Sequence, residues 1–360
     1  MEVAVLGAGL MGAATAWALA RRGRSVALVE AFEVGHHNGS SHGSERIFRR
    51  AYTDPFYAEL TGRAYECWRE LELDTNSNLL QITGAVDTSD PRIRDLEALS
   101  AAMTEAGVEH KVLTAYQAHE RWPFMRFDGT AIFHPQAGTL DPEAAIGACV
   151  RRAIELGASV LSGTRVTGTE LTPNGRVRIL NDRLELTADT LVVAAGAWLP
   201  ELALELPLPE LTVVQKEVFH FRQRDPDTHW PTFVHKGPVQ VYGMPSGRDG
   251  GAEPAVKVGR YDGGPVTSAS TRDGVIDPVA RDSVIEYVRE RLPGLDPEPV
   301  AEASCLFTFA PKDDFILDRH GPYVVVSPCS GHGAKFAPLI GELAADLVEG
   351  RREPRFRLRR

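Results

Sequence analysis

Three glycines near the start of the chain have the spacing of a dinucleotide-binding loop. Gly7, Gly9 and Gly12 form the pattern G-x-G-x-x-G. In such a loop the first glycine permits a tight turn, the second lets the backbone approach a pyrophosphate, and the third lets a helix pack closely against a strand. Glu30 follows at the spacing of the acidic residue that bonds ribose hydroxyls. Because this carboxylate favours a free 2′-hydroxyl, the motif predicts NAD or FAD rather than NADP.

The residues around the glycines form the elements that such a loop requires. The apolar run Glu2–Leu6 predicts a buried strand, and Ala13–Arg22 predicts a helix that is rich in strong helix formers. Gly23 ends that helix, and Ser25–Val29 predicts a second strand. The unit is therefore a β-α-β crossover, which we expect to be right-handed.

A later apolar segment favours FAD as the dinucleotide. Leu191–Ala195 predicts a strand that is buried on both faces. It is followed by Gly196 and Trp198, where backbone could approach a cofactor. Ordinary strand-to-turn punctuation is the alternative interpretation of Gly196. The position of the glycine motif at the very start of the chain also favours FAD over NAD.

Periodicity along the rest of the chain predicts an α/β fold with a strand-rich second part. Further helices are predicted at about 56–73, 91–107, 141–156, 282–292 and 338–349. Further strands are predicted at 82–88, 159–166, 177–180, 183–186, 213–221, 239–242, 255–259 and 323–326. The expected architecture is a Rossmann-type FAD-binding domain (1–78, 140–206 and 300–360) with an α+β substrate domain that holds an antiparallel sheet (79–139 and 207–299). The basic segment 351–360 is expected to be a frayed surface end.

The composition indicates a globular protein without a membrane span. Of the 360 residues, 43% are hydrophobic and 24% are charged, which excludes disorder as the main state. The longest apolar run, Leu191–Leu199, is far shorter than the roughly 20 residues of a membrane helix. A net charge of −10 disfavours nucleic acid as a partner, and four cysteines are too few for a disulfide framework. No signal peptide is predicted, so we expect a soluble cytoplasmic protein, and a monomer.

Seven segments, spread over nearly the whole chain, share the pattern of one enzyme family. They are Val5–Gly12, Asn38–Ala51, Thr190–Trp198, Val241–Pro245, Val256–Gly259, Cys305–Asp318 and Ser330–Phe336. In these segments the chain resembles the monomeric sarcosine oxidase family of FAD-dependent amine oxidases, within the D-amino-acid-oxidase-like superfamily. The resemblance implies oxidation of the C–N bond of a secondary or N-methylated amino acid. Hydride would pass to flavin N5, the imine would hydrolyse in water, and oxygen would reoxidise the flavin with release of hydrogen peroxide.

The resemblance also implies a flavin site. Cys305 matches the cysteine that links covalently to the flavin 8α-methyl group, so the implied cofactor is covalently bound FAD. His42 and Arg46 match residues beside the flavin ring, and His332 lies in the loop at the pyrimidine edge. The remaining expected cofactor contacts are Ser41, Gly196, Trp198, Gly331, Gly333 and Lys335, besides the glycine loop and Glu30.

The same resemblance places residues at the substrate. Arg49 and Lys335 match the pair that holds the substrate carboxylate, for which Arg49 could supply a bidentate clamp. Lys257 matches the lysine that activates oxygen at the N5 edge, where a buried ammonium would stabilise developing negative charge. Tyr242 matches a substrate-side tyrosine. Tyr261 departs from the sarcosine enzymes, which carry a histidine there, so sarcosine itself is not implied as the substrate.

Each assignment has a plainer alternative. The arginines at 46–50 could form a solvated face, and Cys305 could be an inert buried thiol. Strand alternation places Lys257 on the face opposite its two neighbouring valines, where it could point to solvent. His332 could be a polar loop residue satisfied by backbone.

No metal site is expected. His36, His37 and His42 are close in the sequence but lack a cysteine or carboxylate partner at ligand spacing. The expected partners are a small amino acid and oxygen.

Two alternatives to an N-methyl amino acid oxidase stay open. One is an oxidase or dehydrogenase of cyclic imino acids, with pipecolate- or proline-like rings. The other, from a different class, is a non-catalytic flavin-binding subunit of a complex. The joint presence of Arg49, Lys257 and Lys335 argues against the second alternative.

Overall fold

The dinucleotide motif lies in a six-stranded sheet with the order β19-β20-β13-β1-β2-β9. The computed structural model describes residues 1–90, 92–181, 185–204 and 206–358. Neighbouring strands are parallel except for β19, which runs antiparallel to β20. The strands are β1 (Val3–Leu6), β2 (Val26–Val29), β9 (Ser159–Leu161), β13 (Thr190–Val193), β19 (Ile316–His320) and β20 (Tyr323–Ser327). The predicted β-α-β unit and the buried strand near residue 191 are confirmed.

Because side chains alternate along each strand, the two faces of this sheet pack against different hydrophobic cores. Val3 and Val5 pack with the helices on one face, whereas Ala4 and Leu6 pack on the other face. The helices on the first face include α1 (Leu10–Arg21), α5 (Pro142–Glu155) and α7 (Ala337–Val348). The second face meets a small antiparallel sheet of β10 (Val166–Leu171), β11 (Val177–Asn181) and β12 (Leu186–Ala188).

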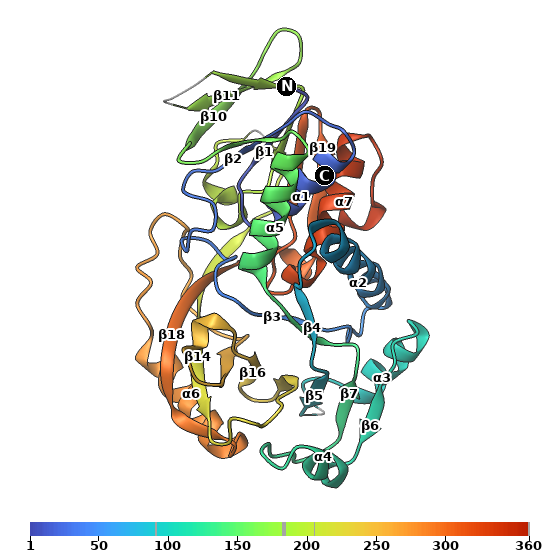
Figure 1. The fold of residues 1–360 in the computed structure, drawn as a ribbon, viewed down its shortest axis with the longest axis vertical. Helices are drawn as coiled ribbons and strands as arrows, with labels where there is room; N and C mark the ends of the chain where they lie inside the picture. Colours follow the sequence, from blue (N-terminus) through green and yellow to red (C-terminus); the bar gives the residue numbers. More distant parts are fainter. Residues whose placement is uncertain (91, 182–184, 205, 359–360) are drawn as a thin grey trace.

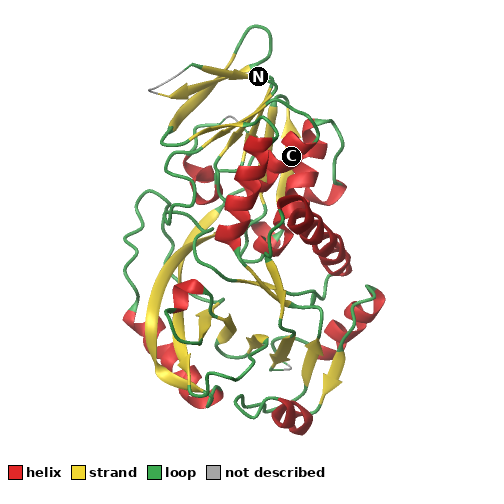
Figure 2. Cartoon of the chain, in the orientation of Figure 1, coloured by secondary structure: helices red, strands yellow, loops and turns green. Residues whose placement is uncertain are grey.

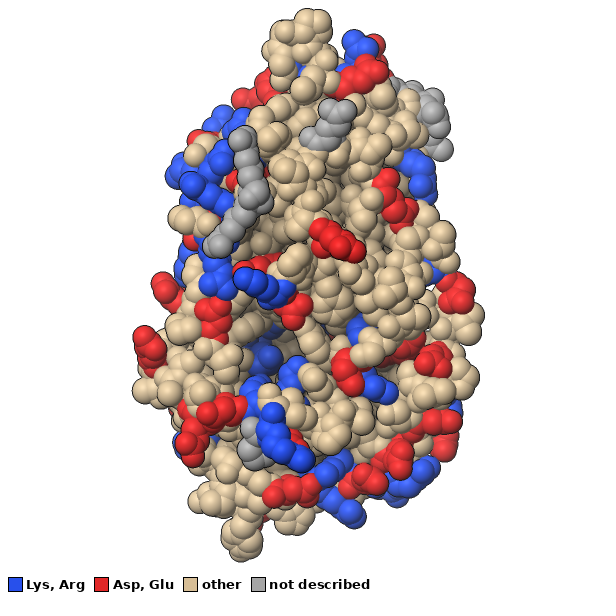
Figure 3. Space-filling model, turned by 180° about the vertical axis from the view of Figure 1, so that it is seen from behind, with Lys and Arg blue, Asp and Glu red and all other residues tan. Residues whose placement is uncertain are grey.

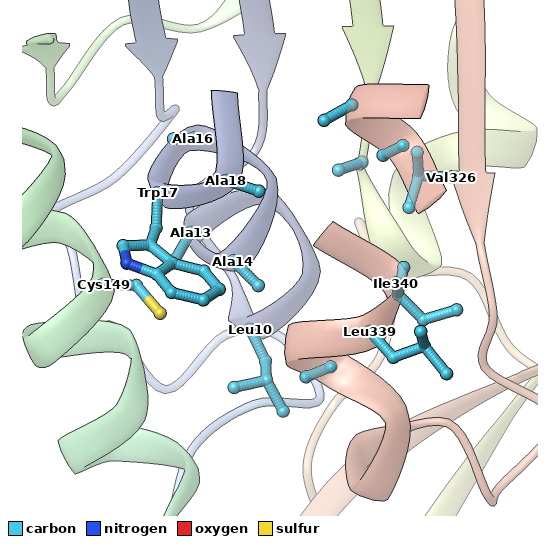
Figure 4. Close-up of a cluster of buried hydrophobic side chains, with 14 of the residues drawn as sticks. Leu10, Ala13, Ala14, Ala16, Trp17, Ala18, Cys149, Val326, Leu339 and Ile340 are labelled. Carbon is cyan, nitrogen blue, oxygen red and sulfur yellow. The ribbon is translucent and has the colours of Figure 1, made fainter. Parts of the chain in front are cut away.

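Helix α1 lies between α5 and α7 (Figure 4). Trp17 of α1 is fully buried beside Cys149 of α5. On the other side, a Cβ at Gly341 of α7 would collide with the carbonyl oxygen of Ala14. Small residues therefore let the two helices approach closely, and this packing fixes the N-terminus of α1 against the sheet.

The second large sheet has eight strands in the order β18-β14-β17-β16-β15-β5-β7-β6. Neighbours are antiparallel except for β15 and β5, which are parallel. The sheet occupies the lower half of the molecule, below the six-stranded sheet (Figures 1 and 2). Its strands are β5 (Ala85–Ser89), β6 (Lys111–Leu113), β7 (Ala131–His134), β14 (Thr212–Gln223), β15 (Thr232–Lys236), β16 (Gln240–Pro245), β17 (Ala255–Arg260) and β18 (Leu295–Phe309).

The two faces of the eight-stranded sheet differ in chemistry. Val256 and Val258 belong to an apolar core that is covered by α6 (Pro278–Arg291). Lys257, between them, lies on the opposite face, as alternation predicts. It is only 3% exposed, so the alternative that it points to solvent is wrong.

Smaller elements connect the two large sheets. A three-stranded sheet with the order β3-β8-β4 lies between them in Figure 1. Its strands are β3 (Arg46–Phe48), β4 (Leu80–Ile82) and β8 (Gly138–Leu140). The remaining helices are α2 (Pro55–Thr75), α3 (Leu96–Glu105) and α4 (Ala115–Arg121), with short 3-10 turns η1 (Gly196–Glu201), η2 (Arg248–Gly250), η3 (Pro311–Asp313), η4 (Ala334–Phe336) and η5 (Pro354–Phe356).

Several predicted boundaries change. The strand predicted at 82–88 is two strands, β4 and β5, because Gly84 turns the chain with φ +74°. The strand predicted at 159–166 is likewise divided between β9 and β10. The helix predicted from residue 91 begins at Leu96 after its N-cap Asp95, and residue 91 itself lies outside the described residues. The strand predicted at 183–186 falls partly outside the described residues, and β12 begins at Leu186.

The C-terminal segment is packed, so the prediction of a frayed end is wrong for its described part. Phe356 is 1% exposed, and its ring centroid lies 5.5 Å from that of Phe56. Arg355 forms ion pairs with Asp54 and Asp314 at 2.8 and 3.2 Å. Apolar burial and these charges anchor the segment onto the start of α2.

The predicted domain boundary at residues 299 and 300 falls inside β18, so Cys305 belongs to the eight-stranded sheet. The division into two domains stays a prediction. Within the described part of the chain, no helix has both the length and the apolar character needed to cross a bilayer.

Candidate active site

The glycine loop between β1 and α1 has the geometry that its sequence predicts. Gly7 has φ +99°, in the left-handed region that favours glycine, and its N–H donates to the carbonyl of Val29 at 2.8 Å. A Cβ at Gly12 would collide with the Gly7 carbonyl oxygen. A Cβ at Gly9 would meet only the Ser41 hydroxyl, at 3.3 Å. Gly12 is therefore required by helix packing, whereas Gly9 keeps space open in front of the helix N-terminus.

Glu30 and Ser41 both contact the start of α1. The Glu30 carboxylate accepts a hydrogen bond from the Ala8 N–H at 2.7 Å. Burial would raise the pKa of Glu30, but hydrogen bonds from His36 and from backbone amides outweigh it and keep this pKa below its usual value. The Ser41 hydroxyl accepts from the N–H of Leu10 at 3.1 Å, in the first turn of α1. A charged carboxylate and a helix N-terminus thus lie together at this end of the site.

A cavity of about 690 Å³ extends from the glycine loop to the eight-stranded sheet. Gly12 lies beneath the loop rather than on the cavity wall. All other residues predicted for the site line the cavity: Gly7, Gly9, Glu30, Ser41, His42, Arg46, Arg49, Gly196, Trp198, Tyr242, Lys257, Tyr261, Cys305, Gly331, His332, Gly333 and Lys335. The structure therefore brings together residues from both ends and from the middle of the chain.

Strand pairing explains why the sheet presents a chemically rich face to this cavity. Residues paired across adjacent strands point to the same side of a sheet. Lys257 pairs with His220 and with Met244, and Tyr242 pairs with Val234. Following the register across the sheet places these side chains on one face: Cys305, Lys216, His220, Lys257, Tyr242, Val234, Lys236 and Asp87.

Two nearby cations influence the pKa of the Cys305 thiol. Burial raises the pKa of Cys305 above its ordinary value, while Arg46 and Lys257 act in the opposite direction. The Arg46 guanidinium donates to the carbonyls of Ser40 and His42 at 2.9 and 2.8 Å. Arg46 therefore braces the 40–46 segment against the cavity.

His42 is a neutral imidazole with an unused nitrogen. Burial, and then Arg46, lower its pKa to about 4. Its Nε2 is buried and has no hydrogen-bond partner in the described part of the chain. Buried polar atoms are normally hydrogen-bonded, so this nitrogen of a cavity-lining residue is an unsatisfied polar atom.

Lys257 forms a buried ion pair that the sequence did not predict. Its Nζ donates to Asp249 Oδ2 at 2.7 Å, with side-chain exposures of 4% and 27%. Asp249 lies in η2, between β16 and β17, and its other oxygen accepts from the Ser44 hydroxyl at 2.5 Å. Burial and then Arg46 lower the pKa of Lys257, and Asp249 opposes them. Asp249 therefore favours the charged ammonium at the cavity wall.

Lys335 belongs to a hydrogen-bonded chain around Tyr52. The Lys335 Nζ donates to the Tyr52 hydroxyl at 3.1 Å and to the His332 carbonyl at 2.7 Å. His332 Nε2 lies 2.9 Å from the Asp313 carbonyl, which can only accept, so this nitrogen carries the proton and Nδ1 accepts from Tyr52 at 3.0 Å. Burial, and then Lys335, lower the pKa of His332 to about 3, so the imidazole is neutral. His332 thereby orients Tyr52.

Arg49 lies beside the same tyrosine, with its guanidinium carbon 5.4 Å from the Tyr52 ring centroid. It also donates to the carbonyl of Ala51 and lies 3.4 Å from Asp87. Arg94 lies 2.9 Å from the same Asp87 oxygen. Burial would raise the pKa of Asp87, but Arg49 and Arg94 outweigh it and keep this pKa well below its usual range. Asp87 is therefore the buried counter-ion that positions Arg49.

The two tyrosines predicted at the substrate also line the cavity. Tyr242 occupies the space above Gly259, where a Cβ would lie 2.7 Å from its hydroxyl oxygen. The Tyr261 hydroxyl donates to the Ser330 carbonyl at 3.3 Å. Gly331 has φ +71°, and a Cβ there would press against Tyr261. The glycines of this loop let it approach the sheet.

The histidines near the glycine loop form pairs with acids. His36 lies 3.3 Å from Glu30, and His37 lies 3.3 Å from Glu143. In the described ranges, no group of three His, Cys, Asp or Glu side chains is placed to hold a metal ion.

Three features of this chain make the cavity suitable for a dinucleotide. Gly9 leaves room before the helix N-terminus, Glu30 is held charged beside it, and His42 Nε2 lacks a partner within the described residues. Helix N-termini of this kind bind phosphate through free N–H groups. A glycine loop at one end of the cavity and cations at the other are the features of a protein that binds a dinucleotide together with an anionic ligand.

Comparisons with known proteins identify the class further. Residues 2–347 match the family described as FAD dependent oxidoreductase, so the chain belongs to this family. It is 32% identical to the monomeric sarcosine oxidase of Streptomyces avermitilis, over 96% of this chain and 93% of that protein. It is 30% identical to the N-methyl-L-tryptophan oxidase of Yersinia pestis, over 98% and 96%. Among solved structures, NikD, an amino acid oxidase essential for nikkomycin biosynthesis, superimposes with a TM-score of 0.86 at 26% identity, over 96% of this chain and 93% of that one.

Sequence reasoning missed the residues that position the predicted ones. They are Tyr52, Asp87, Arg94, Lys236 and Asp249. A signal existed for one of them. Asp87 is a lone acid in an otherwise strand-forming run.

Proposed function

We propose that the protein is an FAD-dependent oxidase of secondary or N-methylated amino acids that uses oxygen and releases hydrogen peroxide. One observation carries the proposal. A single cavity joins the dinucleotide-binding loop to the buried Lys257 on the sheet and to the buried Lys335 with the half-buried Arg49. Two relatives are named as oxidases of sarcosine and of N-methyl-L-tryptophan, and N-methyl amino acids are common to both.

The cations supply binding and orientation. Arg49 and Lys335 would hold the substrate carboxylate. The Arg49 guanidinium would form a bidentate contact, and the Lys335 ammonium would act as a point charge. Two cations that converge on one carboxylate also fix the reacting C–H bond in place. FAD, when bound, supplies the hydride acceptor.

Lys257 would act in the oxygen half of the reaction. A buried ammonium stabilises negative charge that develops nearby, and it does so more strongly than in water because the surroundings exclude solvent. Asp249 opposes the lowering of the Lys257 pKa by burial and by Arg46, and so favours the charged ammonium. Cys305, beside Lys257 and Arg46, would be the point of covalent attachment for the flavin.

The test uses the purified chain alone, with its flavin. Oxygen uptake and peroxide are measured with sarcosine, N-methyl-L-alanine, N-methyl-L-tryptophan, L-pipecolate and L-proline. Peroxide release with an N-methyl amino acid supports the proposal. Turnover of the cyclic acids alone would replace it by the cyclic imino acid alternative, and a flavin that none of them reduces would contradict it.

A Lys257→Met variant tests the oxygen role separately. Flavin reoxidation by oxygen should slow far more than substrate binding weakens. Equal losses in both would show that Lys257 has no specific role in the oxygen reaction.

A further inference from the structure

The cavity wall around Arg49 carries more positive charge than one carboxylate requires. Two additional cations line it there, Arg94 from the segment after β5 and Lys236 from the end of β15. Figure 3 shows a hollow in the lower half of the molecule with Lys and Arg side chains on its walls. Neither Arg94 nor Lys236 is needed to bind the carboxylate of a simple N-methyl amino acid.

Strand register places these cations next to Arg49. Asp87 of β5 pairs with Val234 of β15, and Lys236 lies two residues further along on the same face. Arg94 shares the Asp87 oxygen that also holds Arg49. Lys236 Nζ donates to Gln240 at 2.8 Å. It also lies 4.1 Å from the ring centroid of Tyr261.

The acids at this end do not balance the cations. In the described part of the chain, Arg49 and Arg94 share the buried Asp87, and Asp313 nearby is partly exposed. A third acid that acts on Lys236, Asp262, is already paired with Arg260 at 2.9 Å. The side chains of Arg94 and Arg49 are only 14% and 18% exposed, and Lys335 is 5% exposed. Arg94 Nε is buried without a hydrogen-bond partner among the described residues. Arg49 and Arg94 thus have one carboxylate between them, and buried positive charge that is only partly compensated is costly, so a ligand with two negative charges would complete the site.

The cations also influence one another. Burial, and then Arg49 and Arg94, lower the pKa of Lys236 to about 8. Burial and then Arg49 lower the pKa of Lys335 well below its usual value. Burial is the larger cause of both shifts, and the neighbouring arginines add to it, so an anionic ligand would oppose the contribution of the arginines.

We propose, on the basis of the proposed function, that the substrate is a secondary amino acid with a second carboxylate on its side chain, as in N-methylated aspartate or glutamate. Arg49 and Lys335 hold the α-carboxylate. Arg94 and Lys236 bind the side-chain carboxylate, the guanidinium through the N–H groups that remain beside its bonds to Asp87 and to the Thr88 carbonyl, and the ammonium through its remaining protons.

The experiment compares substrates that differ only in this charge. N-methyl-L-glutamate and N-methyl-L-glutamine have nearly the same size. With the flavin-loaded enzyme, kcat/KM should be about tenfold or more higher for the glutamate than for the glutamine. In a Lys236→Met variant most of this preference should disappear, so that the ratio of kcat/KM for the two substrates approaches one. The matched control is Lys111→Met, an exposed lysine on β6 of the same sheet, which should keep the preference.

A binding measurement separates this inference from the proposed function. Calorimetry on the flavin-loaded protein should show tighter binding of glutarate than of butyrate, and Lys236→Met should reduce that difference. Turnover of neutral N-methyl amino acids with no preference for the glutamate, and equal binding of the two acids, would overturn the dicarboxylate assignment and leave the oxidase function intact. If no N-methyl amino acid reduces the flavin, the oxidase function fails, and the glutarate comparison still decides whether the site binds two carboxylates.

Discussion

Replacing Asp249 by asparagine should change the oxygen reaction of the enzyme through Lys257, which it contacts directly. The carboxylate accepts from Lys257 Nζ at 2.7 Å and from the Ser44 hydroxyl at 2.5 Å. The amide keeps the shape of the side chain but removes its charge. Lys257, with 4% of its side chain exposed, would then be a buried cation without its counter-ion.

The expected loss of stability follows from how buried this pair is. Removing one partner of a fully buried ion pair costs about 3–5 kcal/mol. The Asp249 side chain is 27% exposed, so water replaces part of the interaction. We therefore expect the free energy of unfolding to fall by about 1–3 kcal/mol.

The pH dependence gives the specific signature. Burial and Arg46 lower the pKa of Lys257, and Asp249 opposes them more than Cys305 does, so the loss of Asp249 should lower this pKa further. The charged ammonium exists below its pKa. Flavin reoxidation by oxygen should therefore decline with rising pH, and in Asp249→Asn the decline should begin at a lower pH than in the unmodified enzyme.

Stopped-flow reoxidation across pH and thermal melting measure the two effects. The control is Glu302→Gln, which removes a carboxylate of similar exposure, 28%, from its pair with Arg281 outside the cavity. This control should melt at a slightly lower temperature without any shift in the pH profile. A pH profile of Asp249→Asn that coincides with that of the unmodified enzyme would refute the reasoning, whatever happens to stability.

Three further predictions concern the cofactor and substrate groups. Cys305→Ser should release its flavin on acid denaturation, whereas the unmodified protein should retain it in the precipitate; flavin retained by the variant would contradict the covalent link. Gly9→Ala should melt close to the unmodified apoprotein but bind FAD weakly, whereas Gly12→Ala should lose both stability and FAD, because only its Cβ meets fixed backbone. Arg49→Lys should raise KM for N-methyl amino acids by about tenfold or more, since an ammonium cannot reproduce the guanidinium fork; an unchanged KM would remove Arg49 from the carboxylate site.

The local parts of the site were predictable from the sequence. The turn at Gly7, the close packing at Gly12 and the carboxylate at Glu30 depend on residues within one β-α-β unit. Alternation along one strand likewise placed Lys257 on the correct face of its sheet. Such features depend on short-range geometry, which the order of residues determines.

The partners of these residues were not predictable, because they come from distant parts of the chain. Ser44 and Asp249 meet across a separation of 205 residues. Whether Lys257 is buried depends on the segment that contains Ser44, and alternation within β17 says nothing about it. The prediction of a frayed C-terminal segment was wrong for the same reason. Its many arginines suggested exposure to solvent, but Phe356 packs onto the start of α2. Charge pattern alone does not show which apolar side chain anchors a basic segment.

The most direct test of the account is an anaerobic titration of the purified, flavin-loaded protein with N-methyl amino acids, followed by the flavin absorbance band. The account predicts that an N-methyl amino acid bleaches the band and that admission of oxygen restores it with one peroxide per flavin. A band that no N-methyl or cyclic amino acid bleaches, in protein that retains its flavin, would contradict the assignment of this cavity to amine oxidation.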